Sequence, residues 1–547
     1  MPFVTEGKTN LKYILIVVIL AAIIGGGILG YQYLWLPKQE TKPSEVKPPG
    51  ETAPEEVITQ PELNLNTTKL ATIPEGYWID DKDIIFSPDG KHVAIIIQIP
   101  PKEEGSFIPE KEFVIVNEKQ EKPYDLVEDL EFSPDGKQLA YIACEGEIEY
   151  PRMAGRECQG EDFIVLNGEE GPRYNKIEVW TIRPRSLFSP DSKQFAYIVN
   201  KESDRDIMVI NNKETGVYDA ILDSIFSPNG KQFAYVSVKD GKSLFVNFNG
   251  KEGKTYERIT SILTSSILTF SLDSKRIAYT AGKSGQNFIV VNGKEGKTYD
   301  IVKDLKFSSN NKQLAYVATI CEKGETKYYP ERCDGGKSKD FIVLNGKEGR
   351  AYDSIGEFNF SPDSNQLAYV AKKEGRGFVV INEKEGEIYD GYIGRINFGP
   401  DGKELAYVVN VEGGLGKEFI VVNGKEGKTY NNIWDYVFSP DSKKLVYIAQ
   451  EGSDRLMVVN EKEGKLYNEI HDLVFSPNGN HFAYVARDSR WWGEDKEWGS
   501  KEFIVVNEKE GKPYDFVSKP IFSSDSKYVA YGARDGNELW WIVEPVE

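Results

Sequence analysis

The sequence is poor in the residues from which catalytic and metal sites are most often built. It has three histidines and four cysteines in 547 residues, which leaves little material for histidine-based metal ligation or acid–base catalysis. It also lacks an Asp-x-Asp-x-Asp-Gly calcium loop, a phosphate-binding glycine-rich loop and a Gly-x-Ser-x-Gly elbow. We therefore expect no metal site, no cofactor and no catalytic residue, and we predict that the protein is not an enzyme.

An excess of positive charge is also missing. Acidic residues outnumber basic ones by 86 to 67, which gives a net charge of −19. Nucleic-acid binding depends on a positive footprint that neutralises phosphates. The composition therefore argues against nucleic acid as a partner and is typical of a soluble surface that repels anions.

One stretch near the N-terminus is apolar over the length of a membrane-spanning helix. Residues 13–36 carry no charge, and Gln32 is their only strongly polar side chain. About 20 apolar residues span a bilayer as a helix, so we expect a transmembrane helix at 13–36 that follows a cytoplasmic segment at 1–12. The alternative is a cleaved signal peptide, but hydrophobicity continues past the Gly25-Gly26-Gly27 run where cleavage would fall.

A proline-rich segment follows this apolar stretch. Residues 37–72 mix six prolines with Glu, Lys and Thr, a composition that cannot bury enough apolar surface to fold alone. We interpret it as a disordered, semi-stiff stalk. Residues 73–547 are then predicted to form one repeat domain.

The repeat domain is built on the phrase Phe132-Ser-Pro-Asp-Gly-Lys-Gln-Leu-Ala-Tyr141. A period of 20 to 50 residues is typical of solenoids and propellers. A second phrase, for example 288–300, alternates with the first. The first phrase returns eleven times, with its phenylalanine at Phe86, Phe132, Phe188, Phe226, Phe270, Phe307, Phe360, Phe398, Phe438, Phe475 and Phe522.

One repeat unit, residues 353–390, predicts four antiparallel strands. The Pro362-Asp363-Ser364 turn separates strands at 355–360 and 366–371, and further turns delimit strands at 378–382 and from 388. The second and third strands are apolar on both faces, as in strands that are covered on both sides. A four-stranded blade packed between two neighbours provides that environment, which favours an all-β propeller over a parallel β-helix.

The Phe-Ser-Pro-Asp-Gly-Lys-x-Leu-Ala-Tyr phrase resembles the WD40-like (PD40) repeat of TolB-type β-propellers. The resemblance covers most of the chain after residue 75 and implies that the phrase links the first two strands of each blade. TolB proteins carry a separate α/β domain before the propeller and are released by signal cleavage, and we expect neither here. A TolB-like role in envelope integrity is therefore not carried over.

The two ends of the array are expected to complete one blade between them. Residues 75–80 match a lone fourth strand, because Trp78 precedes Phe86 by the same spacing as Tyr124 precedes Phe132. Residues 539–543 match a third strand without a fourth. This gives eleven blades, more than the four to eight of typical propellers, so both one large ring and two packed rings stay open.

The cysteines form two pairs that flank long loops. Cys144 and Cys158 bracket the loop between the second and third strands of one blade, and Cys321 and Cys333 do so in another. Neither pair has zinc-type Cys-x-x-Cys spacing or a nearby histidine. Two loop-closing pairs indicate disulfides and hence an oxidising compartment. We therefore expect a single-pass protein of the cell membrane whose C-terminal domain lies outside the cytoplasm.

Length variation is confined to the face where the long loops and the crossovers between blades emerge. Insertions on one face of a repeat protein often mark its binding face. The richest loop contains Trp491, Trp492 and Trp498, and Tyr328 and Tyr329 lie in a matching loop. These aromatic side chains are the candidate ligand or partner surface, although they can equally fold back over their own blades. His471 stands beside Asp472, but neighbouring positions on a strand point apart, so we predict no dyad.

These observations lead to three functional hypotheses. The first is a membrane-tethered, extracytoplasmic propeller that acts as a non-catalytic protein-binding or scaffold module of the cell envelope. The second is a cell-surface carbohydrate-binding propeller that uses the tryptophan loop. The third is a hydrolase or lyase whose site lies in the central funnel, for which no particular carboxylate stands out.

Overall fold

The computed structural model describes residues 61–102, 108–149, 156–178, 186–201, 205–259, 267–321, 333, 338–411, 417–488 and 501–546. The predicted transmembrane helix and most of the predicted stalk lie outside these residues. Within the described ranges, no helix combines the length and the apolar character that crossing a bilayer requires. One short 3-10 helix, η2 (Asp81–Asp83), accompanies the strands.

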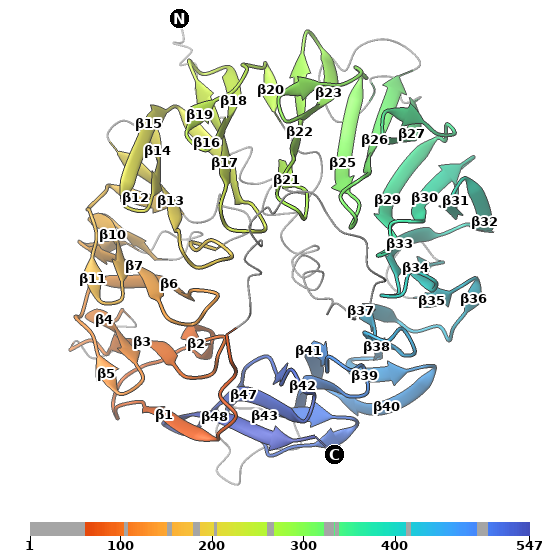
Figure 1. The fold of residues 1–547 in the computed structure, drawn as a ribbon. Coiled ribbons are helices and arrows are strands. Elements are labelled where there is room, and N and C mark those ends of the chain that lie inside the picture. The colour runs from red at the N-terminus through yellow and green to blue at the C-terminus, as the bar shows by residue number, and fades with distance from the viewer. Residues whose placement is uncertain are drawn as a thin grey trace, which may run out of the picture.

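Eleven antiparallel sheets form the body of the molecule, and each has four strand positions. We number the blades 1 to 11 in chain order, from β2–β5 to the closing blade of β45–β48 and β1. Figure 1 shows the sheets fanned around one central opening, with first strands such as β2, β6, β25 and β29 on the side of the opening. These inner strands are β2 (Ile84–Phe86), β6 (Leu126–Phe132), β12 (Lys176–Glu178), β16 (Ala220–Phe226), β20 (Arg258–Ile259) with β21 (Leu268–Phe270), β25 (Ile301–Phe307), β29 (Ser354–Phe360), β33 (Tyr392–Phe398), β37 (Asn432–Phe438), β41 (Glu469–Phe475) and β45 (Phe516–Val517) with β46 (Ile521–Phe522).

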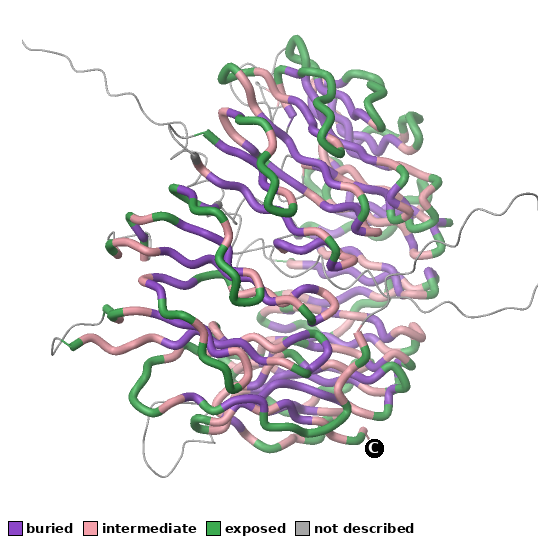
Figure 2. Tube along the Cα trace, turned by 60° about the vertical axis from the view of Figure 1, so that its left-hand side comes forward, coloured by how far each residue is buried: buried purple, intermediate pink, exposed green. Residues whose placement is uncertain are grey.

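The second and third strands form the buried centre of each blade, and their burial patterns show apolar residues covered on both faces. Figure 2 shows this burial running through the middle of every blade. The second strands are β3 (Val93–Ile99), β7 (Leu139–Glu145), β13 (Ala196–Lys201), β17 (Phe233–Lys239), β22 (Ile277–Lys283), β26 (Leu314–Cys321), β30 (Leu367–Lys373), β34 (Leu405–Asn410), β38 (Leu445–Glu451), β42 (Phe482–Asp488) and β47 (Tyr528–Asp535). The third strands are β4 (Lys111–Val116), β10 (Glu161–Leu166), β14 (Arg205–Ile210), β18 (Ser243–Phe248), β23 (Gln286–Val291), β27 (Ser338–Leu344), β31 (Arg376–Ile381), β35 (Glu418–Val422), β39 (Asp454–Val459), β43 (Lys501–Val506) and β48 (Glu538–Pro545).

The outer, fourth strands are mostly two residues long and exposed, and β15, β32 and β40 extend to six. They are β5 (Lys119–Gln120), β11 (Glu169–Glu170), β15 (Lys213–Tyr218), β19 (Lys251–Glu252), β24 (Lys294–Glu295), β28 (Lys347–Glu348), β32 (Lys384–Tyr389), β36 (Lys425–Glu426), β40 (Lys462–Tyr467), β44 (Lys509–Glu510) and, in the closing blade, β1 (Thr68–Thr72). A small extra hairpin, β8 (Ile148–Glu149) and β9 (Glu157–Cys158), stands on blade 2.

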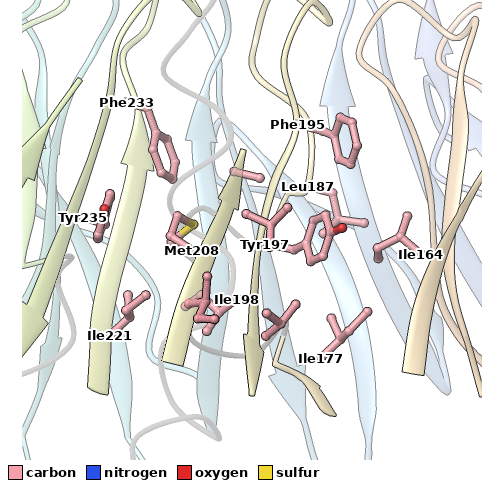
Figure 3. Close-up of a cluster of buried hydrophobic side chains, with 14 of the residues drawn as sticks. Ile164, Ile177, Leu187, Phe195, Tyr197, Ile198, Met208, Ile221, Phe233 and Tyr235 are labelled. Atoms are coloured by element: carbon pink, nitrogen blue, oxygen red, sulfur yellow. The ribbon is translucent and has the colours of Figure 1, made fainter. Parts of the chain in front are cut away.

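Hydrophobic clusters between the blades show that there is one ring and not two. Each cluster joins side chains of neighbouring blades, and together they span every boundary from blade 1 through blade 11 and back to blade 1. The largest cluster runs across blades 2, 3 and 4 and packs Ile164, Tyr197 and Tyr235 in one continuous layer (Figure 3). The fold is therefore an eleven-bladed propeller, as the count of repeats predicted.

The closing blade is completed by a different segment from the one predicted. β1 (Thr68–Thr72) pairs antiparallel with β48, whereas Trp78 bridges to Gln98 of blade 1. The closing strand thus lies just before residue 73, where the repeat domain was predicted to start. Lys69 forms an ion pair of 2.7 Å with Glu538 across this seam. The prediction that the two chain ends share a blade is confirmed, but the choice of residues 75–80 was wrong.

The antiparallel order gives the ring two different faces. Turns between first and second strands, and between third and fourth strands, lie on one face, which we call the turn face. Loops between second and third strands and the crossovers between blades lie on the other, which we call the crossover face. The Ser-Pro-Asp-Gly phrase makes the first kind of turn: Ser439 Oγ donates to Asp441 Oδ1 at 2.6 Å and accepts from the backbone N–H of Lys444 at 2.9 Å.

These turns predict how stability depends on pH. The hydroxyl of Ser439 and a backbone N–H hold the pKa of Asp441 at about 2, below the usual value of about 3.9. A carboxyl with a lowered pKa stabilises the fold above about pH 4, and this contribution is lost as the pH falls through about 2. Asp441→Asn should therefore cost less than about 1 kcal/mol at pH 7, because the side chain is only partly buried and solvent screens its charge.

The variant and the wild type should converge in urea midpoint as the pH approaches 2. Three turns carry asparagine at this position naturally, Asn229, Asn310 and Asn478, so the turn itself should survive the change. A gap in midpoint that stays constant between pH 7 and pH 2 would show that charge at Asp441 plays no part.

Candidate binding surface on the inner strands

The residues that recur in every copy are occupied in holding neighbouring blades together. Tyr299 illustrates this: it leaves blade 5, packs edge to face on Tyr316 of blade 6 at 6.2 Å, and its hydroxyl donates to Glu348 at 2.9 Å. Lys297 pairs with the same carboxylate at 2.5 Å. The repeated Lys-x-Tyr phrase is therefore a structural link between blades.

Buried carboxylates form a second set of links. Asp340, at the start of the third strand in blade 6, is 3% exposed and accepts from the N–H of Ile355 on the inner strand of blade 7 at 3.0 Å. Glu502 makes the same contact to Val517 at 3.1 Å. Burial raises the pKa of Asp162, the corresponding residue of blade 2, although its bond from Ile177 opposes the shift. These three acids therefore link neighbouring blades.

The five aromatic residues predicted as a partner surface lie outside the described residues. Trp491, Trp492, Trp498, Tyr328 and Tyr329 therefore remain a prediction.

The two predicted disulfides are present. Cys144 and Cys158 have a Cα–Cα distance of 6.4 Å, and Cys321 and Cys333 one of 5.5 Å. Arg156 lies two residues before Cys158 of the first bridge, and its guanidinium forms an ion pair with the fully buried Glu112 of blade 1. The disulfides therefore brace the crossover face, and the first of them also helps to join two blades.

The inner strands of blades 8 and 9 each carry an exposed aromatic side chain. Tyr392 at the start of β33 is 61% exposed and Trp434 on β37 is 48% exposed. Tyr392 pairs in register with Asn410 of β34. Arg395, three residues after Tyr392, donates to the carbonyl oxygen of Trp434 at 2.8 Å, which joins the two strands. We call Tyr392 and Trp434 the aromatic platform.

Cationic side chains lie against the platform. The guanidinium of Arg455 stacks over the Trp434 ring at 4.5 Å, and Lys372 Nζ lies 5.8 Å from the centre of the Tyr392 ring. Arg395 is neutralised by Glu418 at 3.1 Å, whereas neither Lys372 nor Arg455 forms an ion pair within the described part of the chain. Both aromatic rings thus lie against a cation, and burial together with the nearby carboxylate of Glu357 raises the pKa of Tyr392.

Two local features fix the geometry of the platform. The inner strand of blade 8 is bulged between Gly394 and Asn397, and Arg395 takes the left-handed conformation with φ of 53°. Such bulges re-aim side chains and are common next to functional sites. A side chain at Gly394 would meet the Tyr392 ring at 2.7 Å, so glycine there lets the tyrosine lie along the strand.

Blade 10 brings together the side chains of His471 and Asp472, which were expected to point apart. His471 Nδ1 lies 2.8 Å from Asp472 Oδ2, and the hydrogen bond from His471 lowers the pKa of Asp472. The prediction that adjacent positions point apart was wrong because Asp472 has φ of 55° at a strand bulge, which rotates its side chain toward its neighbour. The described part of the chain contains no cluster of three or more metal-ligating side chains.

Sequence reasoning missed Tyr392 and Trp434 because they lie inside regular repeat strands. A usable signal was nevertheless present. Four residues before the repeat phenylalanine, blade 9 alone carries a tryptophan, where the neighbouring blades carry Gly394 and His471. Comparing the eleven copies position by position would have singled it out.

Comparisons with known proteins add little. No family model matches the chain, and no curated protein matches it either. Among solved structures, a crystal structure of a eukaryotic initiation factor is 14% identical, with a TM-score of 0.38 over 65% of this chain and 93% of that one. The Dos1 propeller is 12% identical, with a TM-score of 0.30 over 58% and 91%. At these scores the likeness carries no argument, and the architecture follows from the strand pairing described above.

Proposed function

We propose that the chain is a membrane-tethered propeller of the cell envelope that binds a protein partner outside the cytoplasm without catalysing a reaction. One observation carries this proposal. The repeated side chains are used to join the blades, while two exposed, unrepeated aromatic residues stand on the neighbouring inner strands of blades 8 and 9. Large aromatic side chains flanked by arginine are the residues that most often dominate protein interfaces.

Two further observations support the tether and its location. Residues 13–36 are long and apolar enough to span a bilayer, and both cysteine pairs are disulfides, which persist in oxidising compartments. The described chain starts on the turn face, because the N–H of Asn64 donates to the carbonyl of Asp89 in a turn of blade 1 at 2.7 Å. A tether at this end leaves the crossover face open to a partner.

Carbohydrate binding is the second candidate function, since aromatic rings also stack on sugars. Stacking needs a free ring face, and Arg455 already covers one face of Trp434. The cations beside the rings fit a chain segment that combines an apolar side chain with carboxylates better than they fit a neutral sugar.

The test replaces the platform residues by alanine and measures how much partner is crosslinked to the chain. We expect the Tyr392→Ala/Trp434→Ala double variant, in membranes carrying the full chain, to lose crosslinked partner at least about 10-fold. Its melting temperature should stay within a few degrees of wild type, because both side chains are half-exposed. Trp78→Ala is the matched control, since Trp78 is 38% exposed but lies on blade 1.

Three outcomes would contradict the proposal. The double variant could retain its partner in full, or the control could lose it equally. Glycan-array binding that disappears with Trp434 would instead favour the carbohydrate hypothesis, and turnover of a substrate by the purified chain would favour an enzyme.

A further inference from the structure

A lysine and an asparagine meet between the inner strands of blades 6 and 7. Lys306 of β25 and Asn359 of β29 each stand immediately before the repeat phenylalanine, on neighbouring inner strands (Figure 1). Lys306 Nζ lies 2.6 Å from Asn359 Oδ1 and 2.7 Å from the carbonyl oxygen of Phe358. Six of the eleven copies carry an aliphatic residue at this position: Ile85, Leu187, Ile225, Val437, Val474 and Ile521. The pair is therefore particular to this boundary and is no part of the general repeat.

The surroundings of Lys306 favour a neutral amine. Its Nζ lies 5.3 Å from the centre of the Phe358 ring, which is fully buried. Within the described residues it forms no ion pair, and both of its hydrogen bonds go to uncharged oxygens. Burial lowers the pKa of Lys306, although the carboxylates of Glu357 and Asp304 oppose this shift. A neutral lysine amine is a nucleophile, and the amide carbon that carries Oδ1 of Asn359 lies within its reach.

The amide of Asn359 is held at both ends, and a carboxyl group lies beside it. Its Nδ2 donates to the carbonyl oxygen of Ile396 on the inner strand of blade 8, which fixes Oδ1 toward the lysine. Glu357 accepts from the N–H of the same Ile396 at 3.3 Å. Because both side chains contact the backbone of one residue, the Glu357 carboxyl lies close to the amide. A carboxyl group in that place can carry a proton between an amine and an amide.

We propose that Lys306 and Asn359 form a spontaneous isopeptide bond that joins blades 6 and 7 covalently. The lysine amine attacks Cγ of Asn359, so that the Nζ–Cγ bond forms and the Cγ–Nδ2 bond breaks. Glu357 takes one proton from Nζ and passes it to Nδ2, which leaves as ammonia. The carboxyl group ends in the state in which it began, and no electrons are transferred. The bond lies within the ring, so it depends neither on the proposed tether nor on the proposed partner.

Mass spectrometry of the purified full chain tests this proposal. After reduction of the disulfides, the intact chain should be lighter than its sequence by one molecule of ammonia. Trypsin should fail to cleave after Lys306, and the digest should contain a branched peptide in which Lys306 is joined to Asn359. Separate, unmodified peptides around the two residues would overturn the proposal. The same loss of mass without a branched peptide would also overturn it, because that indicates cyclisation of an asparagine.

Substitutions at the pair separate a covalent bond from ordinary hydrogen bonding. Lys306→Arg keeps the charge and can donate to the same oxygens, but a guanidinium that stays protonated is no nucleophile, so the branched peptide should be absent. Asn359→Asp should still form the bond, with loss of water in place of ammonia. A cooperative thermal melt of each variant shows that it is folded. A branched peptide in Lys306→Arg, or its absence in a folded Asn359→Asp, would contradict the proposal.

The role of Glu357 has its own test. Cell-free synthesis of the chain in the presence of nanodiscs allows the branched peptide to be followed from the time of synthesis. Glu357→Gln should slow its formation at least about 100-fold, the usual range for loss of a general acid–base group. Lys303→Arg is the matched control, since Lys303 pairs with the carboxylate of Asp340 at 3.3 Å and not with an amide, and it should leave the rate unchanged. Equal rates in Glu357→Gln and wild type would show that this carboxyl group carries no proton.

Discussion

Replacing Trp541 by alanine is expected to lower the free energy of unfolding by about 3–5 kcal/mol, the usual cost of truncating a buried tryptophan. Trp541 is 1% exposed at the seam between blades 11 and 1. Its indole donates to the carbonyl of Asn64 at 2.9 Å, and its ring packs beside Phe86 at 6.2 Å. The variant therefore loses core packing where the ring closes and leaves a buried carbonyl without its donor.

The neighbouring residue provides the control. Trp540 lies on the same strand, is half-buried, and bonds only to Glu538, two residues away, at 3.2 Å. Trp540→Ala should cost clearly less than Trp541→Ala, because Trp540 is only partly buried at the edge of the cluster between blades 10 and 11. Urea unfolding of both variants measures the two losses in the free energy of unfolding. Equal losses in the two variants would mean that the seam is not specially dependent on Trp541.

The second large effect is expected on removing the disulfides. Cys144 and Cys158 are 14 residues apart in sequence, and Cys321 and Cys333 are 12 apart. Closing loops of this length is worth about 3 kcal/mol each in the chain-entropy model. Serine at all four positions should therefore cost about 6 kcal/mol, measured as the shift in urea midpoint relative to wild type.

The two bridges should not contribute equally. We expect the first, which lies two residues from Arg156, to hold this arginine against Glu112, whose side chain is fully buried. Breaking a buried ion pair costs about 3–5 kcal/mol because it leaves an uncompensated charge. Cys144→Ser/Cys158→Ser should therefore cost clearly more than Cys321→Ser/Cys333→Ser. If Arg156→Met costs nothing in wild type, or the two double variants are equal, the first bridge has no role in positioning the arginine.

The regular part of this fold was predictable because its determinants are local. The turn phrase carries its own hydrogen bonds, as Ser439 and Asp441 show, and doubly covered strands follow from apolar runs. Eleven copies then give eleven blades. The cysteine pairs were predictable for the same reason, since each closes a short loop within a single blade.

The closing strand and the platform depend on contacts that no local pattern encodes. Residues 68–72 lack the repeat phrases, and Lys69 meets its partner Glu538 across 469 positions of sequence. Trp434 becomes a surface feature because β37 is an inner strand, whose backbone Arg395 of the preceding blade contacts. The His471–Asp472 contact needed a left-handed backbone that the sequence pattern does not reveal.

A zero-length crosslink between Lys69 and Glu538 tests the single closed ring most directly. A carbodiimide joins an amine to a carboxylate in contact, and these two groups lie 2.7 Å apart at the seam. The crosslinked peptide pair should form within one molecule, so that a mixture of isotope-labelled and unlabelled chains yields no hybrid pairs. As a positive control, Lys339 and Asp353 also lie 2.7 Å apart and should be joined under the same conditions. Formation of the control link without the seam link, or a seam link found only between different molecules, would contradict a ring that its own two chain ends close.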